Sequence, residues 1–153
     1  GALPGWRSSA RCLTQIDMTT PGYSGTPLAK KLGFKPSARV CVIGAPDGYE
    51  AWLHPLPEGL VFEPQADART DLVHLFTTDK AELAQQLGDL RQRLNPAAAL
   101  WVSWPKKASR VPTDITEDTI RELALPMGWV DIKVCAVSAV WSGLKLVVRK
   151  TLR

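Results

Sequence analysis

Cysteine and histidine are scarce in this chain, and their scarcity excludes two kinds of site. The 153 residues include only three cysteines, Cys12, Cys41 and Cys135, and two histidines. The odd number, the wide spacing and the lack of a CxxC pair argue against a disulfide framework and against a structural zinc site. Cys41 and Cys135 lie in apolar runs and are expected to be small buried hydrophobic residues. We therefore expect no metal, and a reducing compartment, the cytoplasm, as the location.

Long apolar runs and a concentrated charge are also missing. No run approaches the roughly 18 residues that a membrane-spanning helix needs. Residues 1–17 lack the continuous apolar core of a signal peptide. The net charge of +4 is small beside the concentrated basic surface of a dedicated nucleic-acid-binding protein. Neither a membrane nor a nucleic acid is therefore an expected partner.

The length and the apolar content fit one domain. A chain of 153 residues with 45% hydrophobic residues can bury a sizeable core. We expect residues 22–153 to form a single Rossmann-like α/β domain and residues 1–21 to be an N-terminal extension. Met18, just before the patterned sequence, is consistent with a native start that leaves residues 1–17 as an upstream extension. An ordered N-terminal arm is the alternative, and both remain open.

Six short apolar runs have the pattern of β-strands. The run Ala38–Gly44 is nearly continuous in apolar and β-branched residues, as in a central strand that is buried on both faces of a sheet. The predicted strands are Ala38–Gly44, Leu60–Glu63, Leu72–Phe76, Ala99–Trp104, Val130–Val140 and Leu144–Val148. Trp141, Ser142 and Gly143 are expected to form a tight connection between the last two strands.

Helical patterns lie between these strands. A stripe of leucines at helical spacing, from Leu83 to Leu94, predicts the longest helix. Asp79 with Glu82 three residues later predicts a capping box at the start of that helix. Shorter helices are expected at Thr26–Gly33, Tyr49–Leu53 and Thr116–Ala124.

The order of these elements predicts the sheet. Strands that alternate with helices indicate a parallel sheet with right-handed crossovers, and a final hairpin must add one antiparallel strand. Numbered one to six along the chain, the strands are expected in the order 2-1-3-4-6-5, with strand 6 antiparallel, in a three-layer α/β fold. This sheet resembles that of class I S-adenosylmethionine-dependent methyltransferases, shortened by about one strand and one helix between strands 2 and 3. Such a likeness of fold carries no function by itself.

Longer segments of the sequence extend the resemblance to a family. They are GYSGTPLAKKLGFKP, IGAPDGY, DLVHLF, LWVSWPKKAS, TDITEDTIRELALPMGWVDIKVCAV and WSGLKLVVR, and they cover the chain from Gly22 to Arg149. Together they resemble an uncharacterised bacterial family that is known only as a domain of unknown function. The resemblance implies a small cytoplasmic bacterial protein with no assigned activity and no catalytic residues to transfer.

The loop after the first strand is the first candidate for a ligand site. In an open α/β sheet a ligand sits outside the carboxyl ends of the strands where their order reverses, here between strands 1 and 3. Gly44, Ala45, Asp47 and Gly48 form a turn that resembles the glycine-rich cofactor loop of methyltransferases. Pro46 departs from that pattern, because it replaces the usual middle glycine and removes an N–H. A plain turn in which Asp47 caps the next helix is the alternative.

Glu63 is the strongest point in favour of a cofactor. It lies 19 positions after Gly44, at the end of the second strand, where an acid can accept hydrogen bonds from ribose hydroxyls. The sequence evidence for methyl transfer is weaker, because residues 77–80 lack the Asn-Pro-Pro-Tyr type of motif that positions an amino group. His74, in the middle of a strand, is expected to be a hydrogen-bonded, semi-buried histidine. The catalytic residues, if the chain has any, therefore stay unknown.

A second candidate lies at the end of the fourth strand. Ser103, Trp104, Lys106 and Lys107 form an unusual polar run in which adjacent lysines can bind a phosphate-like anion and Trp104 can stack on a ring. The alternative is that the lysines are simply solvated and Trp104 packs on a helix. Trp141 is either part of an interface or ligand lid or, more simply, a partly buried packing residue.

Three functions are compatible with these patterns. The leading hypothesis is a non-catalytic or cryptic Rossmann-like domain without a cofactor, which binds a small anionic ligand or a protein partner through the Gly44–Gly48 loop and the nearby lysines. The first alternative is an S-adenosylmethionine-dependent methyltransferase, with Glu63 on the cofactor and the substrate beside Trp104. The second is a structural or interaction protein, a homo-oligomer formed through strand 5 or 6 at the sheet edge.

Overall fold

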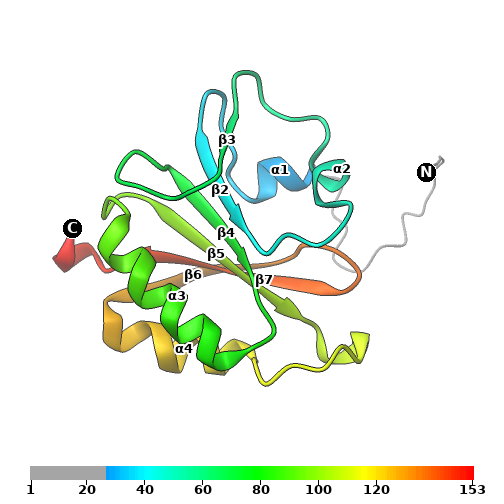
Figure 1. Cartoon of the computed structure of the whole chain (residues 1–153), viewed down its shortest axis with the longest axis vertical. Helices are drawn as coiled ribbons and strands as arrows, with labels where there is room; N and C mark the ends of the chain where they lie inside the picture. Colours follow the sequence, from blue (N-terminus) through cyan, green and yellow to red (C-terminus); the bar gives the residue numbers. More distant parts are fainter. Residues whose placement is uncertain (1–26) are drawn as a thin grey trace.

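Six strands form one mixed sheet in the computed structural model, which describes residues 27–153 (Figure 1). Residues 1–26, with the predicted extension and the predicted Thr26 cap, lie outside the described part. The strands are β2 (Arg39–Ile43), β3 (Val61–Glu63), β4 (Leu72–Phe76), β5 (Ala99–Pro105), β6 (Trp129–Ala136) and β7 (Trp141–Val148). The helices are α1 (Leu28–Lys31), α2 (Tyr49–Leu53), α3 (Lys80–Arg93) and α4 (Glu117–Ala124), with short 3₁₀ helices η1 (Lys107–Ser109), η2 (Leu125–Met127) and η3 (Lys150–Leu152).

The strand order is β3-β2-β4-β5-β7-β6. β2 pairs in parallel with both β3 and β4, and β4 pairs in parallel with β5. β7 is antiparallel to both of its neighbours, β5 and β6. The predicted order and the antiparallel last strand are therefore confirmed, and with them the Rossmann-like α/β fold. Of the two strands considered for a dimer contact, only β6 lies at an edge of the sheet.

The alternation of side chains along β4 divides the core between the two faces. Val73 and Leu75 pack with the leucine stripe of α3, whereas Leu72 and Phe76 pack on the side of α1 and α2. Figure 1 shows α3 and α4 on one side of the sheet and α1 and α2 on the other. The predicted stripe is buried along its length, and each such leucine contributes roughly 1.5–3 kcal/mol of transfer free energy. No helix within residues 27–153 has the length and hydrophobicity that crossing a bilayer requires.

The start of α3 differs in detail from the predicted capping box. Asp79 is the N-cap, and its carboxylate accepts a hydrogen bond from the Glu82 N–H (3.3 Å). The Glu82 carboxylate accepts from the Thr77 hydroxyl (2.6 Å), and that hydroxyl oxygen accepts from the Asp79 N–H (3.2 Å). The reciprocal bond of a capping box is thus made through Thr77, a residue at the end of β4.

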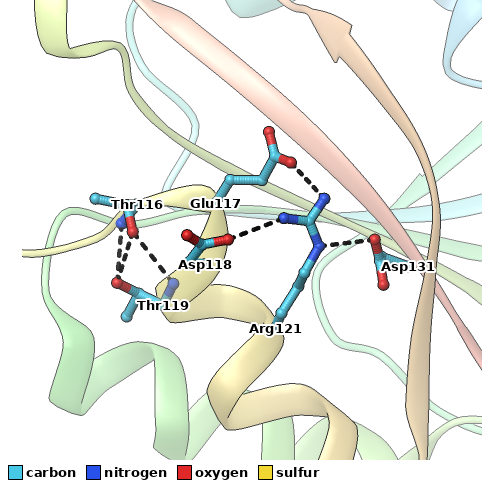
Figure 2. Close-up of polar contacts among 6 residues, drawn as sticks. All are labelled: Thr116, Glu117, Asp118, Thr119, Arg121 and Asp131. Atoms are coloured by element: carbon cyan, nitrogen blue, oxygen red, sulfur yellow. Dashed lines mark hydrogen bonds and ion pairs between the residues drawn. The ribbon is translucent and has the colours of Figure 1, made fainter.

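Arg121 joins α4 to the edge strand β6 (Figure 2). Thr116 begins the helix with a capping box that it shares with Thr119. The Arg121 guanidinium pairs with Glu117, with Asp118 (3.1 Å) and, through Nε, with Asp131 of β6 (2.9 Å). The hydrogen bond from Arg121 lowers the pKa of Asp131 below its ordinary value. One arginine therefore holds three acids, one of them on the neighbouring strand.

The final hairpin corrects one prediction. Trp141, Ser142 and Gly143 do not form the connection, because they belong to β7 and lie opposite Pro105, Trp104 and Ser103 of β5. Residues 137–140 make the turn, and the Ser138 hydroxyl oxygen accepts from the N–H groups of residues 140 and 141 (3.1 Å each). Gly143, which was predicted as a turn residue, instead allows close packing of β7, because an added Cβ would lie 3.2 Å from the Trp101 ring.

We predict that Arg121→Gln lowers the midpoint of thermal unfolding at low salt by roughly 1–3 °C. The effect should shrink in 1 M NaCl, because the three lost ion pairs are exposed enough to be screened. Arg149→Gln is a matched control, since Arg149 donates to the carbonyl oxygen of Leu125 (2.9 Å) and pairs with no acid among residues 27–153. Differential scanning fluorimetry at both salt concentrations measures this, and an equal salt dependence for both variants would contradict it.

Candidate functional site

An open pocket of about 720 Å³ lies outside the carboxyl ends of β2 and β3. Its volume falls within the roughly 300–1,000 Å³ that is usual for small-molecule sites. The predicted loop supplies one wall, and the end of β3 supplies the opposite wall. The lining residues are Val42, Ala45, Pro46, Asp47, Gly48, Tyr49, Glu50, Ala51, Phe62, Glu63 and Pro64. Phe62 of β3 and Glu50 of α2 were not predicted as pocket residues, and Phe62 is 36% exposed.

Gly44 explains why the pocket lies over β2 and β3 rather than in the predicted crevice between strands 1 and 3. Its φ of +72° is in the left-handed region, and an added Cβ would lie only 2.6 Å from the carbonyl oxygen of Phe76. The loop after β2 therefore packs directly against the carboxyl end of β4 at this point. Residues 77–79, which follow β4, do not line the pocket.

The turn that begins α2 has a different cap from the one considered. Gly48, with a φ of +86°, occupies the N-cap position, and no side chain caps the helix. The alternative role of Asp47 as a helix cap is therefore wrong. Asp47 is exposed at the pocket instead, beside exposed Glu50 in the first turn of α2.

The carboxylate of Glu63 is already engaged within the protein. It forms an ion pair with Arg39 and accepts a hydrogen bond from the Thr70 hydroxyl (3.2 Å), and the side chain is only 10% exposed. The Arg39 N–H in turn donates to Asp71 (2.8 Å), which ties β2 to the start of β4. Glu63 thus lines the pocket with its charge balanced by Arg39.

The other predicted ligand residues lie apart from the pocket, at the carboxyl end of β5. Ser103 and Trp104 are buried, the latter in the core on the α3 side. Lys106 is partly exposed and Lys107 is exposed, and neither takes part in an ion pair within the described chain. The structure therefore separates the predicted set into a pocket group (Gly44, Ala45, Asp47, Gly48 and Glu63) and a β5 group (Ser103, Trp104, Lys106 and Lys107).

A buried chain of hydrogen bonds links Tyr49 in the pocket lining to Ser103 of the β5 group. The Tyr49 hydroxyl is 2.7 Å from His74 Nδ1, and His74 Nε2 is 2.6 Å from the Ser103 hydroxyl. All three side chains are at most 4% exposed, and the His74 ring stacks on Phe76 (4.2 Å between centroids). Burial lowers the pKa of His74 to about 3 and raises the pKa of Tyr49, so both groups are neutral near pH 7.

The prediction that His74 is hydrogen-bonded is confirmed, and it is fully rather than partly buried. Its partners could not be foreseen, because Tyr49 and Ser103 lie 25 and 29 positions away in the sequence. Trp141 packs edge-on against Phe76 at 5.1 Å, which corresponds to the simpler of its two predicted roles. Within residues 27–153 no group of three or more His, Cys, Asp or Glu side chains is arranged to hold a metal ion.

Comparison with known proteins identifies the family. Residues 29–150 match the family model described as "Protein of unknown function (DUF3052)". The chain belongs to the DUF3052 family. This agrees with the resemblance to a domain-of-unknown-function family that the sequence segments carry. No curated protein is significantly similar to this DUF3052 chain.

Solved structures similar to this DUF3052 protein include methyltransferases. A SAM dependent methyltransferase from Aquifex aeolicus has a TM-score of 0.61 at 16% identity, over 79% of this chain and 87% of that chain. A putative type 11 methyltransferase from Sulfolobus solfataricus has a TM-score of 0.57 at 10% identity, over 80% and 90%. A possible exported protein from Bordetella parapertussis has a TM-score of 0.54 at 12% identity, over 80% and 66%. At such identities the likeness shows a methyltransferase-like fold and nothing further.

We predict that Gly44→Ala destabilises the protein by roughly 2–4 kcal/mol, because alanine is strained at positive φ and its Cβ meets the Phe76 carbonyl oxygen. Gly88→Ala is the matched control. Gly88 lies inside α3 with nothing within 4 Å of an added Cβ, so alanine there should stabilise by about 0.5–1 kcal/mol. Urea unfolding measures both values. A Gly44→Ala variant as stable as the wild type would show that the loop is not held against β4.

We also predict that His74 makes stability depend on pH in the acid range. The unfolded chain takes up a proton on this histidine near pH 6.5, whereas the folded protein does so only near pH 3. Its contribution is therefore complete above pH 6.5 and is lost as the pH falls toward 3, by up to about 1.4 kcal/mol per pH unit.

The matched pair of variants is His74→Gln and His54→Gln, because His54 is exposed. Urea unfolding at pH 7.0 and pH 4.5 should show a smaller loss of stability for His74→Gln than for the wild type, and an unchanged loss for His54→Gln. The same loss in all three proteins would mean that His74 is not kept neutral by the fold.

Proposed function

We propose that this protein is a small-ligand-binding domain whose pocket, over the carboxyl ends of β2 and β3, takes a neutral or positively charged nucleoside-type ligand. The observation that carries the proposal is the composition of the pocket wall. It contains three carboxylates, those of Asp47, Glu50 and Glu63, and no lysine or arginine among its described residues. The pocket lies outside the carboxyl ends of β2 and β3, beside the crevice between β2 and β4 where open α/β sheets bind their ligands.

The charge of the wall selects the ligand. Glu63 is balanced by Arg39, but Asp47 and Glu50 are exposed, and no ion pair within residues 27–153 involves either of them. Like charges within a few ångströms repel, so these two carboxylates disfavour the anionic ligand of the leading sequence hypothesis at this position. They favour a cation, such as the sulfonium group of S-adenosylmethionine.

The apolar part of the wall suits a flat ring. Phe62 is 36% exposed at the pocket, and Val42, Pro46 and Pro64 line the same space. Ligand pockets commonly combine such apolar surfaces with a few polar groups that fix orientation. A nucleoside base can lie on these side chains while its sugar hydroxyls meet the carboxylates.

S-adenosylmethionine fits this wall in charge and shape, with one change from the sequence-based expectation. The free carboxylates of Asp47 and Glu50 are better acceptors for ribose hydroxyls than Glu63, whose oxygens already accept from Arg39 and Thr70. The N–H groups of Ala45, Asp47 and Gly48 are the candidate backbone donors of this loop, because Pro46 has none. When bound, this cofactor carries a methyl group on a positively charged sulfur.

The proposal is binding without catalysis. The Tyr49 hydroxyl, next to the pocket, is already bonded to His74, and burial keeps both neutral. Tyr49 therefore keeps its proton near pH 7, and His74, with a pKa of about 3, is too weak a proton acceptor to serve as a general base. The methyltransferase alternative uses the same pocket and differs only in turnover.

A second candidate, the anionic ligand, is favoured by one observation at the end of β5. Lys106 and Lys107 carry positive charge toward solvent without an acidic partner in the described region. They could hold a phosphate-like group, although Ser103 and Trp104 are buried and are no longer proposed to contact it.

Calorimetric titration with S-adenosylmethionine and S-adenosylhomocysteine tests the leading proposal. We expect saturable binding, and we expect Asp47→Asn with Glu50→Gln to weaken S-adenosylmethionine by roughly tenfold while affecting the uncharged thioether less. Glu58→Gln is the control, because Glu58 is exposed and does not line the pocket. No binding of either compound at millimolar concentration would overturn the proposal.

Two further measurements separate the alternatives. Conversion of S-adenosylmethionine to S-adenosylhomocysteine by the protein would favour the methyltransferase over simple binding. Retention on a phosphate resin that is lost in Lys106→Gln with Lys107→Gln would favour the anionic site, and retention that these changes leave unaltered would exclude it.

A further inference from the structure

Two lysines lie directly opposite each other in the sheet, on the side of α1. Lys133 of β6 and Lys145 of β7 are register partners in the antiparallel pair. Lys145 is also the partner of Trp101 in β5, and the Trp101 indole N–H donates to the Leu32 carbonyl oxygen at the end of α1 (2.7 Å). Like charges that face each other across two strands destabilise a sheet. The chain keeps this pair in spite of that cost.

Lys35, three residues after Leu32, adds a third positive charge near Lys133 and Lys145. Lys35 and Lys133 both lower the pKa of Lys145, in addition to the larger effect of burial. No acid among residues 27–153 contributes to that shift. The four ion pairs formed within residues 27–153 involve only Arg39 and Arg121, so none of them neutralises Lys35, Lys133 or Lys145.

A structural role accounts for only part of this cluster. The Lys133 ammonium donates to the carbonyl oxygen of Lys31 (3.2 Å), and a cation is favourable at the end of a helix. Lys145 Nζ lies 3.6 Å from the position that a Cβ on Gly33 would occupy, just beyond that end. The last turn of α1 already contains Lys30 and Lys31, and the neighbouring Leu32 carbonyl oxygen already accepts from Trp101. The ammonium groups of Lys35 and Lys145 therefore remain without a structural explanation.

We propose that Lys35, Lys133 and Lys145 form a binding site for a chain of phosphate groups. Ammonium groups make strong charge-assisted hydrogen bonds to phosphate oxygens. A ligand with several negative charges relieves the mutual repulsion of all three lysines at once, which a single carboxylate does not. The site lies on β6 and β7 beside one edge of the sheet, whereas the acidic pocket lies over β2 and β3 at the other side. It is therefore independent of the proposed function.

Calorimetry of the full chain with tripolyphosphate, at constant ionic strength, tests this site. We expect saturable binding that Lys133→Met and Lys145→Met each weaken by roughly tenfold. Lys145→Arg should retain most of it because the charge is kept. Lys150→Met, at an exposed lysine in η3, is the control and should bind as the wild type does.

Thermal unfolding gives a second readout that a purely structural role would not produce. Without ligand, Lys145→Met should be as stable as the wild type or more stable, because a partly buried charge and its repulsion from Lys133 are removed. With tripolyphosphate, the wild type should gain stability and Lys145→Met should not. A parallel titration with a nucleoside triphosphate distinguishes a nucleotide from an inorganic polyphosphate as the preferred ligand.

Three results would overturn the proposal. One is no saturable binding of either compound at millimolar concentration. Another is an equal loss of binding in Lys150→Met. The third is a Lys145→Met variant that is destabilised without ligand and binds unchanged, which would make Lys145 a structural residue only.

Discussion

The close approach of the Gly44 backbone to the carbonyl oxygen of Phe76 is the constraint on which the rest of the site depends. Parallel pairing of β2 with β4 brings the carboxyl ends of both strands to one edge, and the left-handed turn at Gly44 closes the gap between them. The chain leaving β2 is thereby directed over β3, where the loop, α2 and the end of β3 line the open pocket. The glycine that resembles part of a cofactor loop is needed first by the sheet itself, because any larger residue would meet backbone.

The hydrogen-bonded chain from Tyr49 through His74 to Ser103 stabilises the position of α2 on the sheet. It joins α2, β4 and β5, three elements that are far apart in the sequence. Buried polar groups are costly unless they are paired, so the chain specifies one position for α2 relative to the sheet. The wall of the pocket that α2 forms is therefore held in place by hydrogen bonds within the protein, without a bound ligand.

The acidic and basic side chains lie in separate regions of the molecule, although its net charge is small. Acids gather at the pocket, Arg121 joins three acids between α4 and β6, and Lys133 faces Lys145 beneath α1. An overall charge of +4 is thus the sum of separate acidic and basic regions. Electrostatic potential acts locally, since screening limits it to about 10 Å, and each region can select a ligand of its own.

Local pattern by itself determined the architecture of this protein. The strand order, the antiparallel last strand and the leucine stripe of α3 follow from the succession of apolar runs and the short final hairpin, because side-chain period and connection length restrict the topology. Helix capping was predictable only in part. At the start of α3, the Glu82 carboxylate accepts from the Thr77 hydroxyl instead of the expected Asp79 N–H, and at the start of α2 the N-cap residue is Gly48 instead of Asp47. Only the tertiary structure decided where the pocket lies, which groups surround His74 and which lysines face each other. Those relations depend on the register between strands that are distant in the sequence. The alternation along one strand determines which face each side chain takes, but a shift of two residues keeps that face and changes every neighbour.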